Sequence, residues 1–205
     1  MKFNIRLKIG LVILPIFILG SFLLPFFTDV NPTEQGTYFK NMPFSWQHPL
    51  GTNALGQDIF WFLIFAIRNS LLLGISVSLC TLVISLVMGL SAGYLGGWLD
   101  RAIMLLTDSF ITIPSFPILI VLGALIRGST SFVLVGVILV AFGWAWGART
   151  MRSIALSIRE REFVHMAWFS GAGPAEIIVK EVFPYVYAYS IVGFINSILF
   201  VINTE

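Results

Sequence analysis

Charged residues are scarce in this sequence. Asp, Glu, Lys and Arg make up 11% of the 205 residues, 58% are apolar, and the mean hydropathy is +0.93. An ordinary soluble protein has roughly 25% charged residues, so a soluble domain of this composition would expose too much apolar surface. The formal net charge of +2 is too small, and its residues too scattered, for a nucleic-acid surface. The composition therefore predicts a membrane protein that does not bind nucleic acid.

Cysteine and histidine are almost missing. The single cysteine, Cys80, lies in an apolar run, which excludes an intramolecular disulfide and a cysteine zinc cluster. The two histidines, His48 and His165, lie outside the long apolar runs. An intramembrane protease needs a paired nucleophile and base, or a metal site, within the membrane. The sequence therefore disfavours that class of enzyme, and no span shows the repeated polar lining of a channel.

The sequence is instead rich in long apolar runs. A membrane-spanning helix needs about 20 largely apolar residues, and five runs meet that need: residues 9–27, 69–99, 102–126, 128–148 and 182–204. The first is interpreted as a retained helix, kinked at Pro15, because no small-residue cleavage site of a signal peptide follows it. Gly96 and Gly97 predict a turn after the second run. Pro114 and Pro117 predict that the third span is broken.

The basic residues predict the orientation, because cytoplasmic loops retain Lys and Arg. With a cytoplasmic N-terminus, nine basic residues lie inside and only Lys40, Arg68 and Arg127 lie outside. Five spans would then place Glu205 outside the cell, and we therefore expect a truncated chain. The nine cytoplasmic residues are Lys2, Arg6, Lys8, Arg101, Arg149, Arg152, Arg159, Arg161 and Lys180.

Two polar segments separate the runs. Residues 28–57 form an external loop, and the aromatic run Phe60-Trp61-Phe62 after it is expected to be an interfacial helix at headgroup level. Residues 151–182 form the largest cytoplasmic piece and are predicted to contain two short helices. The first runs from about residue 157 to 170, with Gly171 in a left-handed conformation just past its end. Pro174 suits the first position of the second helix.

The cytoplasmic piece has two interpretations that the residues alone leave open. It is either a tether between spans or a compact docking surface for a rigid partner, and an expected helical ion pair between Glu176 and Lys180 fits both. Within the spans, Gly89 and Gly93 are spaced for close helix packing. Asp108, an ionisable residue inside the third span, is expected either to pair with Arg101 or Arg149 or to contact solute.

The order of several motifs resembles a known family, the inner-membrane permease subunits of binding-protein-dependent ABC importers of the dipeptide, oligopeptide and nickel group. Their cytoplasmic signature is Glu-Ala-Ala, three residues, Gly, nine residues, an aliphatic residue, one residue, then Leu-Pro. Its spacing is kept here without a gap, although His165 replaces the acidic residue, Met166 the first alanine and Glu181 the aliphatic residue. The aligned residues are His165, Met166, Ala167, Gly171, Glu181, Phe183 and Pro184.

Further motifs resemble the same family along the whole chain. The external stretch His48-Pro49-Leu50-Gly51-Thr52 resembles the hallmark of the peptide and nickel branch, with Asn53 and Gln57 where that branch usually has Asp and Arg. Other matches are Gly143-Trp144, Ala148-Arg149, Arg152, the run from Arg159 to Val164 with Glu162, Ala92-Gly93-Tyr94, Gly96-Gly97, Asp100, Arg101, Asp108 and Pro114. The family's sixth span is absent.

The resemblance implies an all-α polytopic membrane protein with the permease fold of a type I ABC importer, showing five transmembrane helices of an expected six. Residues 1–68 would form an N-terminal region and residues 69–205 the permease domain. A coupling loop at about 153–184 would dock on the ATPase. Its candidate residues are Glu162, His165, Ala167, Gly171, Ala172, Glu181 and Pro184, while Asp108, Pro114, Gly89 and Gly93 are candidates for the transport path or for helix packing.

The resemblance also implies the partners and the activity. These are a second permease subunit, two cytosolic ABC ATPase subunits, an extracytoplasmic solute-binding protein and membrane lipid. The chain lacks the phosphate-binding motif Gly-x-x-x-x-Gly-Lys-Ser/Thr. We therefore expect that it is not an enzyme and holds no cofactor, and that the ATPase subunits bind ATP and Mg. The expected function is uptake of short peptides across the plasma (inner) membrane. The alternatives are that the chain takes up nickel or another small solute, or that it is a truncated partner that assembles without transporting.

Overall fold

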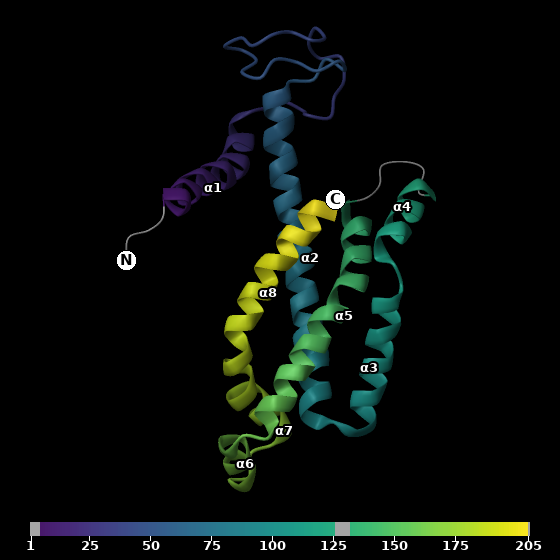
Figure 1. Cartoon of the computed structure of the whole chain (residues 1–205). Coiled ribbons are helices and arrows are strands. Elements are labelled where there is room, and N and C mark those ends of the chain that lie inside the picture. The colour runs from purple at the N-terminus through teal and green to yellow at the C-terminus, as the bar shows by residue number, and fades with distance from the viewer. Residues whose placement is uncertain (1–4, 126–131, 205) are drawn as a thin grey trace. The chain divides into compact units, whose positions relative to one another are not determined.

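The computed structural model describes residues 5–125 and 132–204, and the described residues form helices joined by loops (Figure 1). Four helical segments are long and apolar enough to cross a membrane, and one bent helix pair makes a fifth candidate span. This confirms the prediction of an all-α protein with five spans. Lys2, Ile126, Arg127, Gly128 and Glu205, which entered the predictions above, lie outside the described residues.

Contacts divide the chain into two compact units, Met1–Leu72 and Leu73–Glu205. In the first unit, helix α1 (Ile5–Leu23) contains Pro15 and continues into the 3-10 helix η1 (Leu24–Phe27). The polar loop that follows is folded upon itself: His48 Nδ1 lies 2.7 Å from Asp58 Oδ2, and both side chains are buried. Thr52 Oγ1 donates to the carbonyl oxygen of Phe39 at 2.6 Å. The polar stretch singled out in the sequence is therefore a structured loop.

Helix α2 (Ile59–Leu95) begins directly after this loop. The backbone N–H of Phe60 donates to Asp58 Oδ1 at 2.8 Å, so the Asp58 carboxylate caps the first turn. The prediction of a separate interfacial helix at Phe60-Trp61-Phe62 is wrong, since these residues form the first turn of α2. No glycine or proline follows until Gly74, so nothing in the sequence interrupts the helix there.

The other end of α2 confirms the predicted turn. Gly96 and Gly97 have φ of 68° and 64°, and helix α3 (Gly97–Thr112) starts at once. Helix α4 (Ser115–Leu125) follows at 62° to α3, which confirms the broken third span. The break is at Pro114, whose ring disfavours helical backbone at Ile113 (ψ 121°). Pro117 lies in the first turn of α4, where a missing N–H costs little.

Helix α5 (Phe132–Arg159) is the centre of the second unit. It contacts α3, α4 and helix α8 (Phe183–Thr204) (Figure 1). Its small residues face α2. A Cβ built on Gly147 would lie 2.4 Å from Ser85 Oγ, and one on Gly143 would lie 3.0 Å from Thr81 Cγ2. Ser85 Oγ donates to the carbonyl oxygen of Trp144 at 2.8 Å. Close backbone approach therefore joins α2 to α5 along most of their shared length.

Candidate functional site

The helix-turn-helix segment, residues 160–184, connects α5 to α8. Helix α5 continues to Arg159, Arg161 is extended, and helix α6 (Glu162–Phe169) follows. The predicted first helix over residues 157–170 is therefore wrong at its start, because residues 157–159 belong to α5. The chain turns at Glu160 and Arg161 so that Ile158 and Val164, on either side of the turn, enter the same buried cluster.

Gly171 closes α6 as predicted. It has φ of 87°, a left-handed conformation that favours glycine. Its N–H donates to the carbonyl oxygen of Trp168 at 3.0 Å, and the N–H of Ala172 donates to that of Ala167 at 3.1 Å. These two bonds make a Schellman motif, which satisfies the last carbonyls of the helix. A Cβ on Gly171 would meet nothing within 4 Å, so the space outside the turn is open.

The second helix begins at Pro174, as predicted. Helix α7 (Pro174–Ile177) passes into a π-helical turn, η2 (Ile178–Val182), and then into α8 without a break. The widened turn stands directly before Pro184, whose missing N–H removes the usual helical bond to residue 180. Lys180 Nζ lies 2.7 Å from Glu176 Oε1, which confirms the predicted ion pair. The second predicted helix and the fifth predicted span are thus one continuous helical segment.

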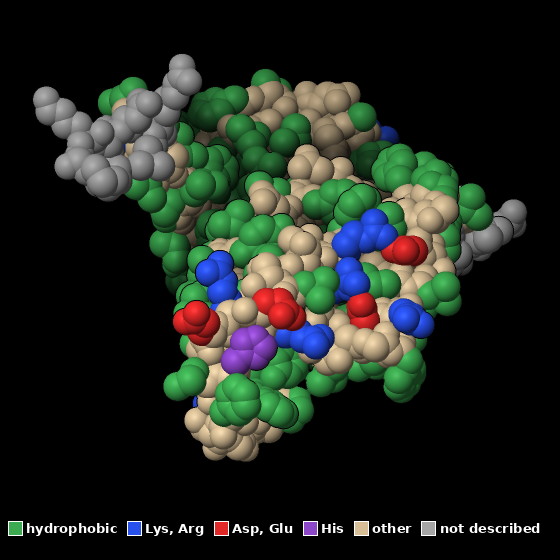
Figure 2. Space-filling view, turned by 60° about the horizontal axis from the view of Figure 1, so that its bottom comes forward, with side chains coloured by type: hydrophobic (Ala, Val, Ile, Leu, Met, Phe, Trp, Pro, Cys, Tyr) green, Lys and Arg blue, Asp and Glu red, His purple; other side chains and the backbone are tan. Residues whose placement is uncertain are grey.

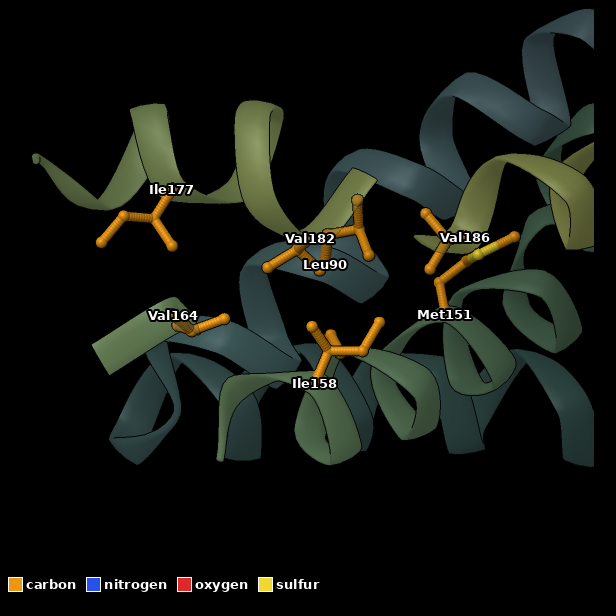
Figure 3. Close-up of a cluster of buried hydrophobic side chains, with 8 residues drawn as sticks. Leu90, Met151, Ile158, Val164, Ile177, Val182 and Val186 are labelled. Carbon is orange, nitrogen blue, oxygen red and sulfur yellow. The ribbon is translucent and has the colours of Figure 1, made fainter. Parts of the chain in front are cut away.

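A buried hydrophobic cluster ties this segment to the spans (Figure 3). Ile177, Val182 and Val186 are fully buried. Phe163 of α6 also stacks on Tyr185 of α8 with ring centroids 5.0 Å apart. The segment is therefore rigidly packed on the ends of α2, α5 and α8. The cluster consists of Leu90, Met151, Ala155, Ile158, Val164, Ile177, Val182 and Val186.

The opposite face of the segment is exposed and partly apolar. Met166, Trp168, Phe169 and Val179 are 67%, 61%, 77% and 64% exposed. Charged side chains gather at the end of the helices where α6 and α7 lie (Figure 2). Large apolar side chains beside charges, on a part that is held rigidly from behind, have the composition of a docking surface.

The predicted residues of the segment divide between its two faces. Ala167 and Ala172 pack against the buried cluster. Glu162, His165 and Pro184 are exposed, and Glu181 is half-buried. The exposed aromatic residues were missed as candidates, although Trp168-Phe169 beside the glycine turn was a readable signal in the sequence.

The candidates within the spans have structural neighbours. A Cβ on Gly89 would lie 2.5 Å from the carbonyl oxygen of Ala148, and one on Gly93 would lie 2.6 Å from that of Arg152. Both glycines therefore lie at close contacts between α2 and α5. Asp108 forms an ion pair with Arg149, one of its two predicted partners.

A second ion pair between α3 and α5 was not predicted. Arg152 Nη2 donates to Asp100 Oδ2 at 2.6 Å, and Arg152 Nε donates to Asp100 Oδ1. This two-point geometry suits the planar guanidinium. With Asp108 and Arg149, it fixes α3 to α5 through two charged pairs.

Comparison with known proteins decides which family has this architecture. Residues 85–205, which include the helix-turn-helix segment, match the family of binding-protein-dependent transport system inner membrane components. The chain belongs to this family. Membership confirms the predicted multi-pass inner-membrane protein and the resemblance noted in the sequence.

The individual relatives are named either as oligopeptide permeases or as nickel permeases. The chain is 34% identical over 146 residues to the oligopeptide transport system permease protein OppC of Mycobacterium tuberculosis (strain ATCC 25618 / H37Rv), covering 71% of this chain and 50% of the relative. It is 40% identical over 136 residues to the nickel transport system permease protein NikC of Escherichia coli (strain K12), covering 66% and 48%. It is 33% identical over 158 residues to OppC of Lactococcus lactis subsp. cremoris (strain SK11), covering 77% and 52%. The chain spans about half the length of these relatives.

Proposed function

We propose that this chain is a membrane-spanning permease subunit of an ATP-driven importer that carries short peptides across the plasma membrane. It works with a second permease subunit, two cytosolic ATPase subunits that bind ATP and Mg, and an extracytoplasmic binding protein that delivers the solute. Family membership supports the permease role, and the two relatives named for oligopeptides support the solute. The excess of basic residues on one side of the spans supports a cytoplasmic N-terminus.

The helix-turn-helix segment is the observation that carries the coupling role. Its exposed face bears Met166, Trp168 and Phe169, while its buried face contributes Val164 and Ile177 to the cluster shared with three spans. A close-packed cluster transmits displacement rather than absorbing it. A movement of the ATPase against the exposed face is therefore passed to α2, α5 and α8.

The test replaces Gly171 by arginine in the assembled complex. Gly171→Arg places a long side chain in the open space outside the turn, and it also strains the backbone. Gly171→Ala, the matched control, strains the backbone in the same way without the bulk. We expect ATPase co-purification and ATP-dependent peptide uptake to fall at least about tenfold for arginine and much less for alanine. Unchanged co-purification and uptake in Gly171→Arg would refute docking at this turn.

Nickel uptake is the second candidate function, favoured by the 40% identity to a nickel permease. The same reconstituted complex distinguishes the two. ATP-dependent accumulation of a labelled tripeptide supports peptide import, whereas accumulation of labelled nickel without the peptide supports the alternative.

A further inference from the structure

Helix α3 leaves one of its sides uncovered by the rest of the second unit. Among the described helices it packs chiefly on α5, and it lies at the edge of this unit (Figure 1). Ile103 and Thr107 form its buried side. The other side is an exposed stripe, because its residues recur every three or four positions along the helix. The exposed stripe of α3 consists mainly of Trp98, Arg101, Ala102, Leu105 and Ser109.

The stripe changes from aliphatic to polar over two helical turns. Leu105 is 74% exposed on a helix of the broken span, so hydrocarbon is the environment that suits it. Arg101 lies about 6 Å and Trp98 about 10 Å closer to the α2–α3 turn along the helix axis. The headgroup layer on each side of a bilayer is about 5–8 Å thick. Arg101 therefore lies within the headgroup layer and Trp98 at its water-facing edge.

Arg101 gives this stripe a positive charge that the neighbouring residues leave unbalanced. The adjacent Asp100 forms a two-point ion pair with Arg152, and Asp108 pairs with Arg149. No ion pair between described residues includes Arg101. Both acidic residues of α3 are therefore already neutralised, and the stripe complements a ligand that carries negative charge.

An anionic phospholipid has the chemistry that fits all three levels of the stripe. A guanidinium binds phosphate oxygens with two parallel hydrogen bonds, and the lipid's net negative charge balances that of Arg101. The indole N–H of Trp98 is a donor for headgroup oxygens, and an acyl chain covers the apolar surface of Leu105. Free phosphate would match only the arginine and would leave Leu105 uncovered.

We infer that the exposed stripe of α3 binds an anionic phospholipid, with its phosphate on Arg101, its headgroup beside Trp98 and an acyl chain along Leu105. The lipid holds the α2–α3 turn at a fixed depth in the bilayer. It belongs to the cytoplasmic leaflet in the orientation given above, so the inference rests on the proposed function for the choice of leaflet alone.

The test measures which lipids surround Ala102, an exposed residue between Arg101 and Leu105. In a Cys80→Ser background, Ala102→Cys carries a fluorophore, and the protein, with the subunits that co-purify with it, is placed in phosphatidylcholine nanodiscs. A small fraction of phosphatidylglycerol or of phosphatidylcholine carries a nitroxide near the headgroup, which quenches the fluorophore on contact. The ratio of the two quenching efficiencies gives the local preference for anionic lipid. Arg101→Gln removes the charge of the stripe, and Arg161→Gln, the matched control, removes that of an exposed arginine on the helix-turn-helix segment.

We expect phosphatidylglycerol to quench about fivefold more than phosphatidylcholine, the preference that one arginine gives at a membrane surface. Arg101→Gln should abolish this preference, whereas Arg161→Gln and Arg101→Lys should keep it.

Equal quenching by the two lipids in the protein with Arg101 intact would overturn the anionic preference. Quenching by neither lipid would show that water or protein covers this side of α3, and would overturn the lipid site. An equal fall in Arg101→Gln and Arg161→Gln would assign the preference to net charge and overturn the role of the stripe. Quenching requires no transport, so a protein that keeps the preference but takes up no peptide would overturn the proposed function alone.

Discussion

Gly171 shows how one backbone conformation organises the helix-turn-helix segment. Its positive φ allows two hydrogen bonds to close α6 and turns the chain toward Pro174. Any other L-residue except Asn or Asp visits this conformation only at a cost of roughly 1 kcal/mol. The glycine therefore fixes the angle between α6 and α7.

Gly171→Ala is expected to lower the free energy of unfolding by about 1 kcal/mol. A fall in the melting temperature of the purified protein would measure this. Gly173→Ala is the matched control, because Gly173 has an ordinary φ of −74° and open space around it. The strain argument fails if both variants lower the melting temperature equally.

The two ion pairs between α3 and α5 differ in exposure. The Asp100 and Arg152 side chains are 16% and 30% exposed, whereas those of Asp108 and Arg149 are 57% and 45% exposed. Arg152→Gln is therefore expected to destabilise the protein by about 1 kcal/mol, and Arg149→Gln by less. The melting temperatures of the two variants test this. The double variant Asp100→Asn/Arg152→Gln separates the contribution of the ion pair from that of the Arg152 side chain alone. A larger effect for Arg149→Gln would contradict it.

Contact between α2 and α5 depends on glycine at the points of closest approach. At Gly89, a Cβ would lie 2.5 Å from a backbone oxygen and 2.6 Å from Met151 Cβ, so the helices would have to move apart. We expect Gly89→Ala to destabilise the protein by about 1–3 kcal/mol. Gly193→Ala in α8 is the control, since its Cβ would meet nothing within 4 Å, and it should be neutral or stabilising. Thermal unfolding of both variants measures the difference, and equal stability would refute close packing there.

Helix boundaries show where local sequence signals were sufficient. Gly96, Pro114, Gly171 and Pro174 each mark an end or a start that the sequence predicted, because each restricts its own backbone. The end of α5 at Arg159 has no such residue. It depends on Ile158 and Val164 entering a cluster with distant residues, which a local pattern cannot reveal.

The distribution of Lys and Arg predicts the orientation of the whole molecule in the membrane. We expect Thr37 to lie outside the cell and Ser170 inside. In a Cys80→Ser background, a membrane-impermeant maleimide applied to intact cells should label Thr37→Cys. It should label Ser170→Cys only after the membrane is dissolved in SDS. The reverse pattern would contradict a cytoplasmic N-terminus.

Sequence by itself determined the class of this protein, the candidate spans among the described residues and the main turns. Apolar length, glycine, proline and basic residues are local features of the chain. In lipid, the backbone N–H and C=O groups of each span must form their hydrogen bonds within that span. The sequence also named Arg149 as one of two candidate partners of Asp108 and indicated close helix packing at Gly89 and Gly93, because charges and closely spaced small residues inside a span need partners.

Only the tertiary structure decided which partners these residues have. Asp100 meets Arg152 because α3 packs on α5, and Ser85 donates to the carbonyl oxygen of Trp144 because α2 packs on α5. The rigid attachment of the helix-turn-helix segment likewise arises from side chains on several helices. Such contacts join residues far apart in the chain, and their geometry is fixed by helix packing rather than by any local pattern.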